Sequence, residues 1–263
     1  MVDWDGDARK DLLVGQLDGT VMVCRNVGED EAPVFDDGVF VRVGPAGAKA
    51  NIDVGDTAAP TIVDWDNDGK KDLVIGAEDG RLHYLANEGT DAQPDFVSSA
   101  YVLAQGGADL VVAHEQSSPV ILDLDGDGKK DLLTGNTPGQ LLFYGNVGTD
   151  EAPAFSGHSQ VEADGKPIVL DAVTGASPRS RPFVTDWNDD GLPDVLIGAG
   201  NGKIHLYSAV GEPCDIPEPA TLILLGAAGL GLLLRLRTRT SGPRREQPGQ
   251  RGFQRSLPGP RKR

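Results

Sequence analysis

Short apolar runs, each closed by a glycine, recur at nearly equal intervals along the chain. One set reads D-L-L-V-G, D-L-V-I-G, D-L-L-T-G and D-V-L-I-G, at residues 11–15, 72–76, 131–135 and 194–198. Runs of this length that are rich in Val, Ile and Leu are typical of buried β-strands rather than helices. A second set of apolar runs follows, at residues 21–24, 82–85, 141–144 and 204–207. The pattern therefore predicts an all-β chain made of repeated strand pairs.

Each repeat also carries features that predict two more strands. A proline lies upstream of three of the first-set runs, and a Pro-x-Phe sequence follows three of the second-set runs, which gives Pro60, Pro119, Pro182, Phe35, Phe96 and Phe155. We expect one strand after the proline and a looser one near the phenylalanine. Four short strands in a repeat of about 60 residues are typical of a β-propeller blade. The predicted blade units lie near 1–59, 60–118, 119–181 and 182–211.

Differences in repeat length are confined to one part of each unit. The distance from the phenylalanine to the next unit varies, whereas the spacing within the rest of the unit is constant. The segments 36–57, 97–117 and 156–180 are therefore expected to hold the fourth strand and variable loops. Variable loops on a rigid repeat scaffold commonly contact partners.

An acidic nine-residue segment precedes each run of the first set. Its pattern is D-x-[DN]-x-D-G-x-x-D, and its copies occupy residues 3–11, 64–72, 123–131 and 186–194. Carboxylates at positions 1, 3 and 5 of a tight loop point to one side, and a glycine at position 6 permits a sharp turn. Oxygen ligands gathered in this way are those that a hard cation such as Ca²⁺ prefers. A single copy would also fit a solvated turn, but four copies in register favour a cation site.

The loops do not match a helix–loop–helix calcium site. That class of site needs a bidentate Glu at position 12 and a following helix. Position 12 holds Val14, Ile75, Thr134 and Ile197, and the residues around it form the predicted strands.

The repeats resemble FG-GAP/VCBS repeats, the calcium-loop blades of integrin α-subunit heads and of many exported bacterial proteins. The resemblance rests on the four acidic loops in register, and it covers residues 1–211. It implies a β-propeller in which Ca²⁺ is bound by the side chains at positions 1, 3, 5 and 9 and by the backbone carbonyl at position 7. The implied ligands are Asp3, Asp5, Asp7, Arg9 and Asp11; Asp64, Asp66, Asp68, Lys70 and Asp72; Asp123, Asp125, Asp127, Lys129 and Asp131; and Asp186, Asn188, Asp190, Leu192 and Asp194.

The first and fourth loops depart from the pattern. Ala8 replaces the glycine at position 6 of the first loop. The fourth loop has the neutral ligand Asn188 at position 3 and Leu192-Pro193 before its last aspartate. We therefore expect these two sites to bind Ca²⁺ more weakly than the second and third.

The array of repeats is shorter than most propellers of this kind. The first unit has no upstream proline and strand, and the fourth has no Pro-x-Phe sequence. We interpret the four visible blades as the C-terminal part of a larger ring of about seven blades. A complete four-bladed ring is the alternative.

The residues after 211 form a different kind of segment. A linker at 212–219 contains Pro217-Glu218-Pro219, an uncharged stretch follows at 220–234, and a basic, Pro- and Gly-rich tail occupies 235–263. This order resembles the PEP-CTERM sorting signal of exported bacterial proteins. The resemblance implies a transmembrane helix at 220–234, sorting by an exosortase-type system, anchoring in the inner membrane and final placement at the cell surface or in the extracellular matrix. The tail itself is predicted to be disordered.

Charge is divided between these two parts. The chain carries a formal charge of −16, and residues 235–263 hold nine Arg, one Lys and one Glu, a charge of +9. The remainder therefore carries −16 − 9 = −25. A basic tail directly after an apolar segment sets membrane topology, and we expect no nucleic acid partner.

No catalytic motif is found in the sequence, and we expect the chain not to be an enzyme. The favoured function is a calcium-binding adhesion or interaction scaffold whose partner is an extracellular protein or polysaccharide. The alternative is the propeller of a larger secreted enzyme that acts on polysaccharide, with its catalytic part outside this chain.

Overall fold

The computed structural model describes residues 2–172, 175–209 and 236–238. Within these residues every regular element is a β-strand and none is a helix, which confirms the predicted all-β class. The expected helix at 220–234 and the linker at 212–219 lie outside the described residues.

The second and third repeats each fold into a four-stranded antiparallel sheet in simple sequence order. The second sheet consists of β6 (Ala59–Val63), β7 (Asp72–Gly76), β8 (Leu82–Leu85) and β9 (Ala100–Tyr101). The third consists of β11 (Ser118–Leu122), β12 (Asp131–Gly135), β13 (Leu141–Tyr144) and β15 (Ser159–Gln160). Four strands per repeat are therefore confirmed here, with the fourth strand inside the variable segment.

The first and fourth repeats are variants of this sheet. The first contains β1 (Leu12–Gly15), β2 (Val21–Cys24) and β3 (Val39–Phe40). The fourth contains β18 (Ser180–Thr185), β19 (Asp194–Ala199) and β20 (Ile204–Ala209), followed at the edge by β21 (Leu236–Thr238), β16 (Glu162–Ala163) and β17 (Lys166–Pro167). Two small sheets join neighbouring segments: β4 (Arg42–Val43) with β5 (Ala50–Asn51), and β10 (Leu103–Ala104) with β14 (Ala154–Phe155).

Strand β21 takes the place of the Pro-x-Phe strand that the fourth repeat lacks. In the second repeat Phe96 bridges antiparallel to Asn87, and in the fourth Leu236 pairs in the same way with Ala209. Phe96 and Leu236 each also pair in parallel with a residue of the preceding repeat. Three residues of the tail that was expected to lack structure thus form a strand. They supply partners for the backbone groups along the edge of β20, which would otherwise be open.

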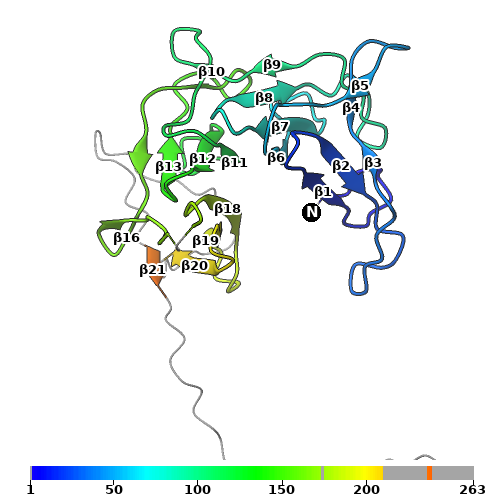
Figure 1. Cartoon of the computed structure of the whole chain (residues 1–263). Coiled ribbons are helices and arrows are strands. Elements are labelled where there is room, and N and C mark those ends of the chain that lie inside the picture. The colour runs from blue at the N-terminus through cyan, green and yellow to red at the C-terminus, as the bar shows by residue number, and fades with distance from the viewer. Residues whose placement is uncertain (1, 173–174, 210–235, 239–263) are drawn as a thin grey trace, which may run out of the picture.

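The four sheets stand side by side around a common centre (Figure 1). Strand β6 lies between β1 and β11, and β11 lies against β18. This radial order of antiparallel sheets is the one expected for consecutive propeller blades.

The hydrophobic core lies between successive sheets. On β7, Leu73 and Ile75 pack against the first repeat, whereas Val74 packs against the third. On β12, Leu132 faces the second repeat and Leu133 faces the fourth. Because side chains alternate between the two faces of a strand, a strand buried on both faces reads as a continuous apolar run, as the sequence does here.

An aromatic pair recurs at two of the three interfaces between repeats, and a closely packed glycine recurs at all three. The tryptophan at position 2 of one acidic loop packs near the phenylalanine of the next repeat, with ring centroids 6.2 Å apart for Trp4 and Phe96 and 6.3 Å for Trp65 and Phe155. The glycine that ends the second strand lies against the next repeat. A Cβ at Gly76 would lie 2.3 Å from the carbonyl oxygen of Ser117. Neighbouring repeats therefore pack through large aromatic side chains and through glycines that leave room for the next backbone.

Candidate metal centres

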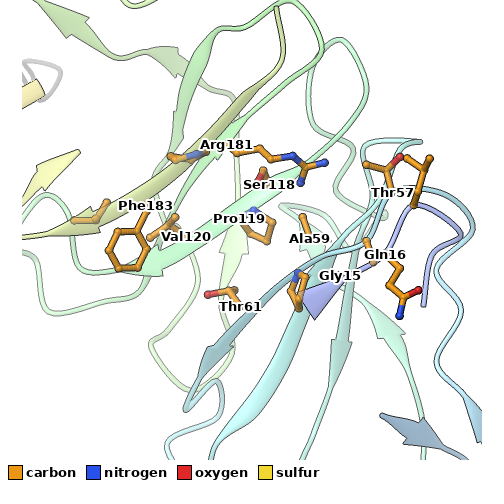
Figure 2. Close-up of a pocket in the computed structure, with 15 residues that line it drawn as sticks. Gly15, Gln16, Thr57, Ala59, Thr61, Ser118, Pro119, Val120, Arg181 and Phe183 are labelled. Carbon is orange, nitrogen blue, oxygen red and sulfur yellow. The ribbon is translucent and has the colours of Figure 1, made fainter. Parts of the chain in front are cut away.

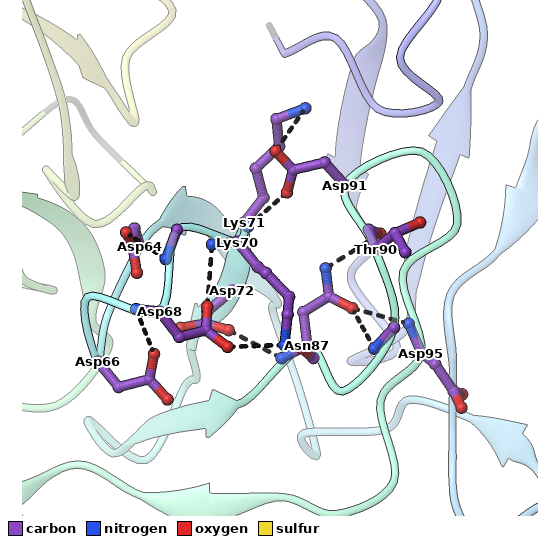
Figure 3. Close-up of polar contacts among 12 residues, drawn as sticks. Asp64, Asp66, Asp68, Lys70, Lys71, Asp72, Asn87, Thr90, Asp91 and Asp95 are labelled. Atoms are coloured by element: carbon purple, nitrogen blue, oxygen red, sulfur yellow. Dashed lines mark hydrogen bonds and ion pairs between the residues drawn. The ribbon is translucent and has the colours of Figure 1, made fainter.

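In the second, third and fourth repeats the acidic loop joins the first two strands of the sheet, and in the first repeat it leads directly into β1, so the four loops occupy equivalent places in the array. In the second repeat β6 ends at Val63, the loop runs from Asp64, and Asp72 is already the first residue of β7. Figure 3 shows the carboxylates of this loop with the residues that hold it.

The aspartate at position 9 anchors the loop to the sheet. In the second repeat one oxygen of Asp72 accepts the backbone N–H of Trp65 (2.9 Å) and the other accepts that of Asn87 (2.8 Å), near the end of the third strand. The equivalent pair of hydrogen bonds is formed in all four repeats, by Asp11, Asp72, Asp131 and Asp194, and all four side chains are buried. The aspartate at position 9 therefore anchors the loop to the sheet and is also an implied metal ligand.

The aspartate at position 1 folds the loop back on itself. Asp64 accepts the backbone N–H of Gly69 (3.0 Å), and Asp123 accepts those of Gly126 (2.7 Å) and Gly128 (3.0 Å). Gly69 has a φ of 85°, a left-handed conformation that glycine adopts without steric cost. Ala8 takes the same conformation in the first loop, with a φ of 69°, so the expected strain at this position is present.

Three of the four loops bring three carboxylates together. In each of these groups the candidate ligand oxygens lie within 4.8 Å of one another, and the groups are Asp3, Asp5 and Asp11; Asp64, Asp66 and Asp72; and Asp123, Asp125 and Asp127. In the fourth loop, which the structure describes in full, no such group of three forms. The sequence-predicted residues at positions 1 and 3 therefore converge in the first three loops, whereas positions 5 and 9 are brought in selectively.

Two oxygens in these groups lack a hydrogen-bond donor. Among the described residues, Asp5 Oδ1 and Asp64 Oδ1 are buried and accept no hydrogen bond. A buried carboxylate oxygen without a partner carries a large desolvation cost. A divalent cation would remove that cost, so the residues present fit a hard cation such as Ca²⁺.

The pKa values of two aspartates at position 9 reflect their burial and the carboxylates around them. Burial raises the pKa of Asp72 above its ordinary value, and the neighbouring carboxylates of Asp66 and Asp68 raise it further. The pKa of Asp131 is raised for the same reasons. Bound positive charge would favour the ionised forms and reverse this shift.

A basic side chain at position 7 is a feature that the sequence reasoning missed. Only the backbone carbonyl of this residue was considered, but its side chain forms an ion pair with the aspartate at position 5: Arg9 with Asp7 (2.6 Å), Lys70 with Asp68 (2.7 Å) and Lys129 with Asp127 (3.2 Å). The recurrence of a basic residue at this position was the signal available. Leu192 occupies the place in the fourth loop and cannot form the pair.

A lysine at position 8 reaches from one repeat to the loop of the preceding one. Lys71 Nζ donates to the backbone carbonyl of Asp3 (2.6 Å), and Lys130 Nζ donates to Asn67 Oδ1 (2.5 Å). The third loop lacks this support because the fourth repeat has Pro193 at position 8. The two loops held in this way gather carboxylates from positions 1, 3 and 9, whereas the third gathers positions 1, 3 and 5.

Comparison with known families agrees with this geometry. The model of the FG-GAP-like repeat matches residues 3–75 and 64–134, which together span half of the chain. The chain belongs to the FG-GAP-like repeat family. The model of the PEP-CTERM protein-sorting motif matches residues 215–238. No curated protein matches the chain.

The sorting motif indicates where this FG-GAP-like repeat protein is delivered. A PEP-CTERM motif implies export, anchoring through the C-terminal region and processing by exosortase-type machinery, as the sequence predicted. In the part of the chain that the structure describes, no helix is long and apolar enough to cross a membrane. The apolar stretch 220–234 lies outside that part.

Proposed function

We propose that this exported repeat protein binds Ca²⁺ in its acidic loops and uses the cation to stabilise an interaction scaffold. The observation that supports the proposal is the convergence of three carboxylates in each of the first three loops, with donor-free buried oxygens in two of them. When bound, Ca²⁺ supplies positive charge and oxygen coordination. The protein's part is to hold positions 1, 3, 5 and 9 together in a loop that is anchored at the strand ends.

The second and third sites are proposed to bind more tightly than the first and fourth. The second and third loops have glycine at position 6, whereas Ala8 strains the first. In the fourth loop the predicted ligands Asp186, Asn188 and Asp190 are present, but three carboxylates do not converge. The ranking follows from turn strain in one case and from weaker oxygen donors in the other.

The scaffold is proposed to be a non-catalytic propeller that presents its variable segments to an extracellular protein or polysaccharide. The radial packing of the sheets supports blades of a propeller. The outer face of the fourth sheet supports a further blade, because Trp187 is 60 % exposed there whereas Trp65 is 6 % exposed at an internal interface. A ring of about seven blades at the cell surface remains our proposal for the complete assembly.

Thermal melting of the metal-free full-length protein in mild detergent tests the calcium part. We expect Ca²⁺ to raise the Tm by several degrees relative to EGTA, because a site filled at 100 times its Kd stabilises by about 2.7 kcal/mol. The Asp66→Asn and Asp125→Asn variants should lose part of the shift. Asp53→Asn, an exposed aspartate outside the loops, is the matched control. Identical melting curves in Ca²⁺ and EGTA would contradict the proposal.

A further inference from the structure

Strands from all four repeats line an open pocket, the central cavity, at the centre of the array. Its volume is about 560 Å³, within the range of small-molecule sites. The walls come from the end of β1 and from β6, β11 and β18 with the residues that lead into them. Most of the lining is glycine, alanine, proline, valine and threonine, so the cavity is formed largely by backbone and small side chains.

Among the residues that the structure describes, Arg181 is the only charged one that lines this cavity. Figure 2 shows its side chain beside Ser118, with Val120 and Phe183 on one wall and Thr57 on the other. The protein carries 40 Asp and Glu residues, and none of those that the structure describes contributes to the lining. A single guanidinium in a cavity without carboxylates attracts an anion, even though the chain as a whole is acidic.

The repeat itself does not require an arginine here. Arg181 directly precedes Pro182, and the equivalent residues before Pro60 and Pro119 are Ala59 and Ser118. Both neighbours build the same first strand with a small side chain. The arginine is therefore an addition to one repeat, and its side chain is available for a role other than folding.

Two arginines and one glutamate lie in this region, so the positive charge of Arg179 and Arg181 is only partly balanced by Glu78. Arg181 also lines a second cavity of about 610 Å³, which it shares with Arg179. Arg179 pairs with Glu78 at 3.8 Å, whereas no carboxylate oxygen of the described residues lies within 4.0 Å of the Arg181 guanidinium. Burial lowers the pKa of Arg181, and Arg179 lowers it further, yet an arginine remains charged at neutral pH.

The remaining lining suits a sugar ring rather than a bare anion. Phe183 is 57 % exposed and presents an apolar ring to the cavity. Thr57, Thr61 and Ser118 supply hydroxyl groups, which both donate and accept hydrogen bonds. Ligand sites typically combine an apolar or aromatic wall with a few convergent polar groups.

We propose that the central cavity binds an acidic sugar, with its carboxylate on Arg181 and its ring against Phe183. A guanidinium can hold a carboxylate through two parallel hydrogen bonds, which fixes orientation as well as charge. This inference deepens the proposed scaffold role by naming a ligand class, and it assigns the ligand to the centre of the array rather than to the variable loops. It requires the folded repeats but no particular occupancy of the acidic loops.

Calorimetric titration of the full-length protein in mild detergent with Ca²⁺ present tests the proposal, with glucuronate, glucose and acetate as probes. Glucuronate should bind at least about tenfold more tightly than either of the others, because only it offers both the carboxylate and the ring. Equal binding of glucose would overturn the role of Arg181, and equal binding of acetate would overturn the sugar.

Two variants locate the site. Arg181→Ser copies the residue of the third repeat, so it should fold with an unchanged Tm and lose at least about tenfold in glucuronate affinity. Lys166→Ser removes an exposed positive charge on β17 and should leave the affinity unchanged. Undiminished binding by Arg181→Ser would overturn the proposal. If that variant has a lower Tm than the wild type, Arg181→Lys replaces it. This change keeps the positive charge but removes the paired N–H donors of the guanidinium, so it should still weaken binding several-fold.

The titrations also separate this inference from the calcium proposal. Glucuronate binding with no effect of EGTA on the Tm would refute the calcium proposal alone. A calcium-dependent Tm with no glucuronate binding would refute the sugar site alone.

Discussion

The second repeat, which lies inside the array, and the fourth, which is the last one described, share the same strand pattern and the same loop but differ in what supports them. Trp65 is buried against Phe155 of the next repeat, whereas its counterpart Trp187 is exposed. Gly76 lies against the next backbone, whereas a Cβ at Gly198 would meet no described atom closer than 3.9 Å. The tryptophan and the glycine therefore pack against a neighbouring repeat in the interior of the array, whereas their counterparts in the fourth repeat have no such packing among the described residues.

The difference extends from packing to the acidic loops. The second loop has a glycine turn, an ion pair at position 7 and a lysine from the next repeat that reaches back to it. The fourth loop has Leu192 at position 7 and no converging group of three carboxylates. Loop geometry is thus completed partly by the following repeat, which is why equivalent nine-residue segments do not make equivalent sites.

Alanine at the interface glycines should separate the second and fourth repeats most strongly. In Gly76→Ala the new methyl would lie 2.3 Å from the Ser117 carbonyl oxygen, so the backbone of two repeats must move. We expect destabilisation by about 3 kcal/mol or more, whereas Gly198→Ala should change stability by less than about 0.5 kcal/mol. Thermal melting of both variants measures the contrast. A large loss of Tm in Gly198→Ala would show that its face is packed in solution.

Removal of the aspartate at position 9 should show what the third and fourth repeats have in common. Asp131→Ala leaves the buried backbone N–H of Asn146 and the partly buried one of Leu124 without an acceptor. A loss of about 3 kcal/mol follows, because each unsatisfied group costs about 1–3 kcal/mol.

Asp194→Ala in the fourth repeat is the companion measurement and should cost a similar amount, since Asp194 accepts the same two bonds from Trp187 and Ala209. Asp127→Ala removes an exposed carboxylate and serves as the control. If Asp131→Ala or Asp194→Ala is as stable as this control in EGTA, the anchoring role is contradicted.

Much of this fold could be predicted because the repeat pattern reports local structure directly. The apolar runs locate two adjacent strands of each sheet, and the nonapeptide locates every loop. The fourth strands lie in the predicted variable segments, where β9 and β15 are only two residues long. Period, strand order and loop position are encoded within single repeats, so a single sequence is sufficient for them.

Contacts between repeats could not be predicted in the same way. That Trp65 meets Phe155, or that Lys130 reaches Asn67, depends on how two sheets are placed side by side. The pairing of β21 with β20 joins segments far apart in the sequence. The central cavity likewise exists only where several first strands converge, so Arg181 read as an ordinary strand residue.

Relief of turn strain in the first loop should give a smaller effect. Ala8 has a φ of 69°, where an L-residue with a Cβ costs about 1–2 kcal/mol relative to its ordinary conformations. Ala8→Gly should therefore raise stability by about 1 kcal/mol and bring the first site closer to the second in Ca²⁺ affinity. Gly69→Ala in the second loop is the reverse change and should lower both. An Ala8→Gly variant with a lower Tm in both Ca²⁺ and EGTA would contradict the strain argument.

The smallest expected effect belongs to the ion pair at position 7. Leu192→Lys gives the fourth loop the residue of the second and third, and it should add about 0.2–1 kcal/mol in EGTA, the usual size for an exposed pair. Lys70→Leu makes the opposite change in the second loop, where Lys70 Nζ also donates to the carbonyl of Asn87 (3.2 Å). Both effects should shrink in high salt, because screening weakens exposed charge pairs. Melting at low and high ionic strength distinguishes this pair from packing: a Lys70→Leu loss that does not depend on salt would show that the alkyl stem of the lysine, not its charge, supports the loop.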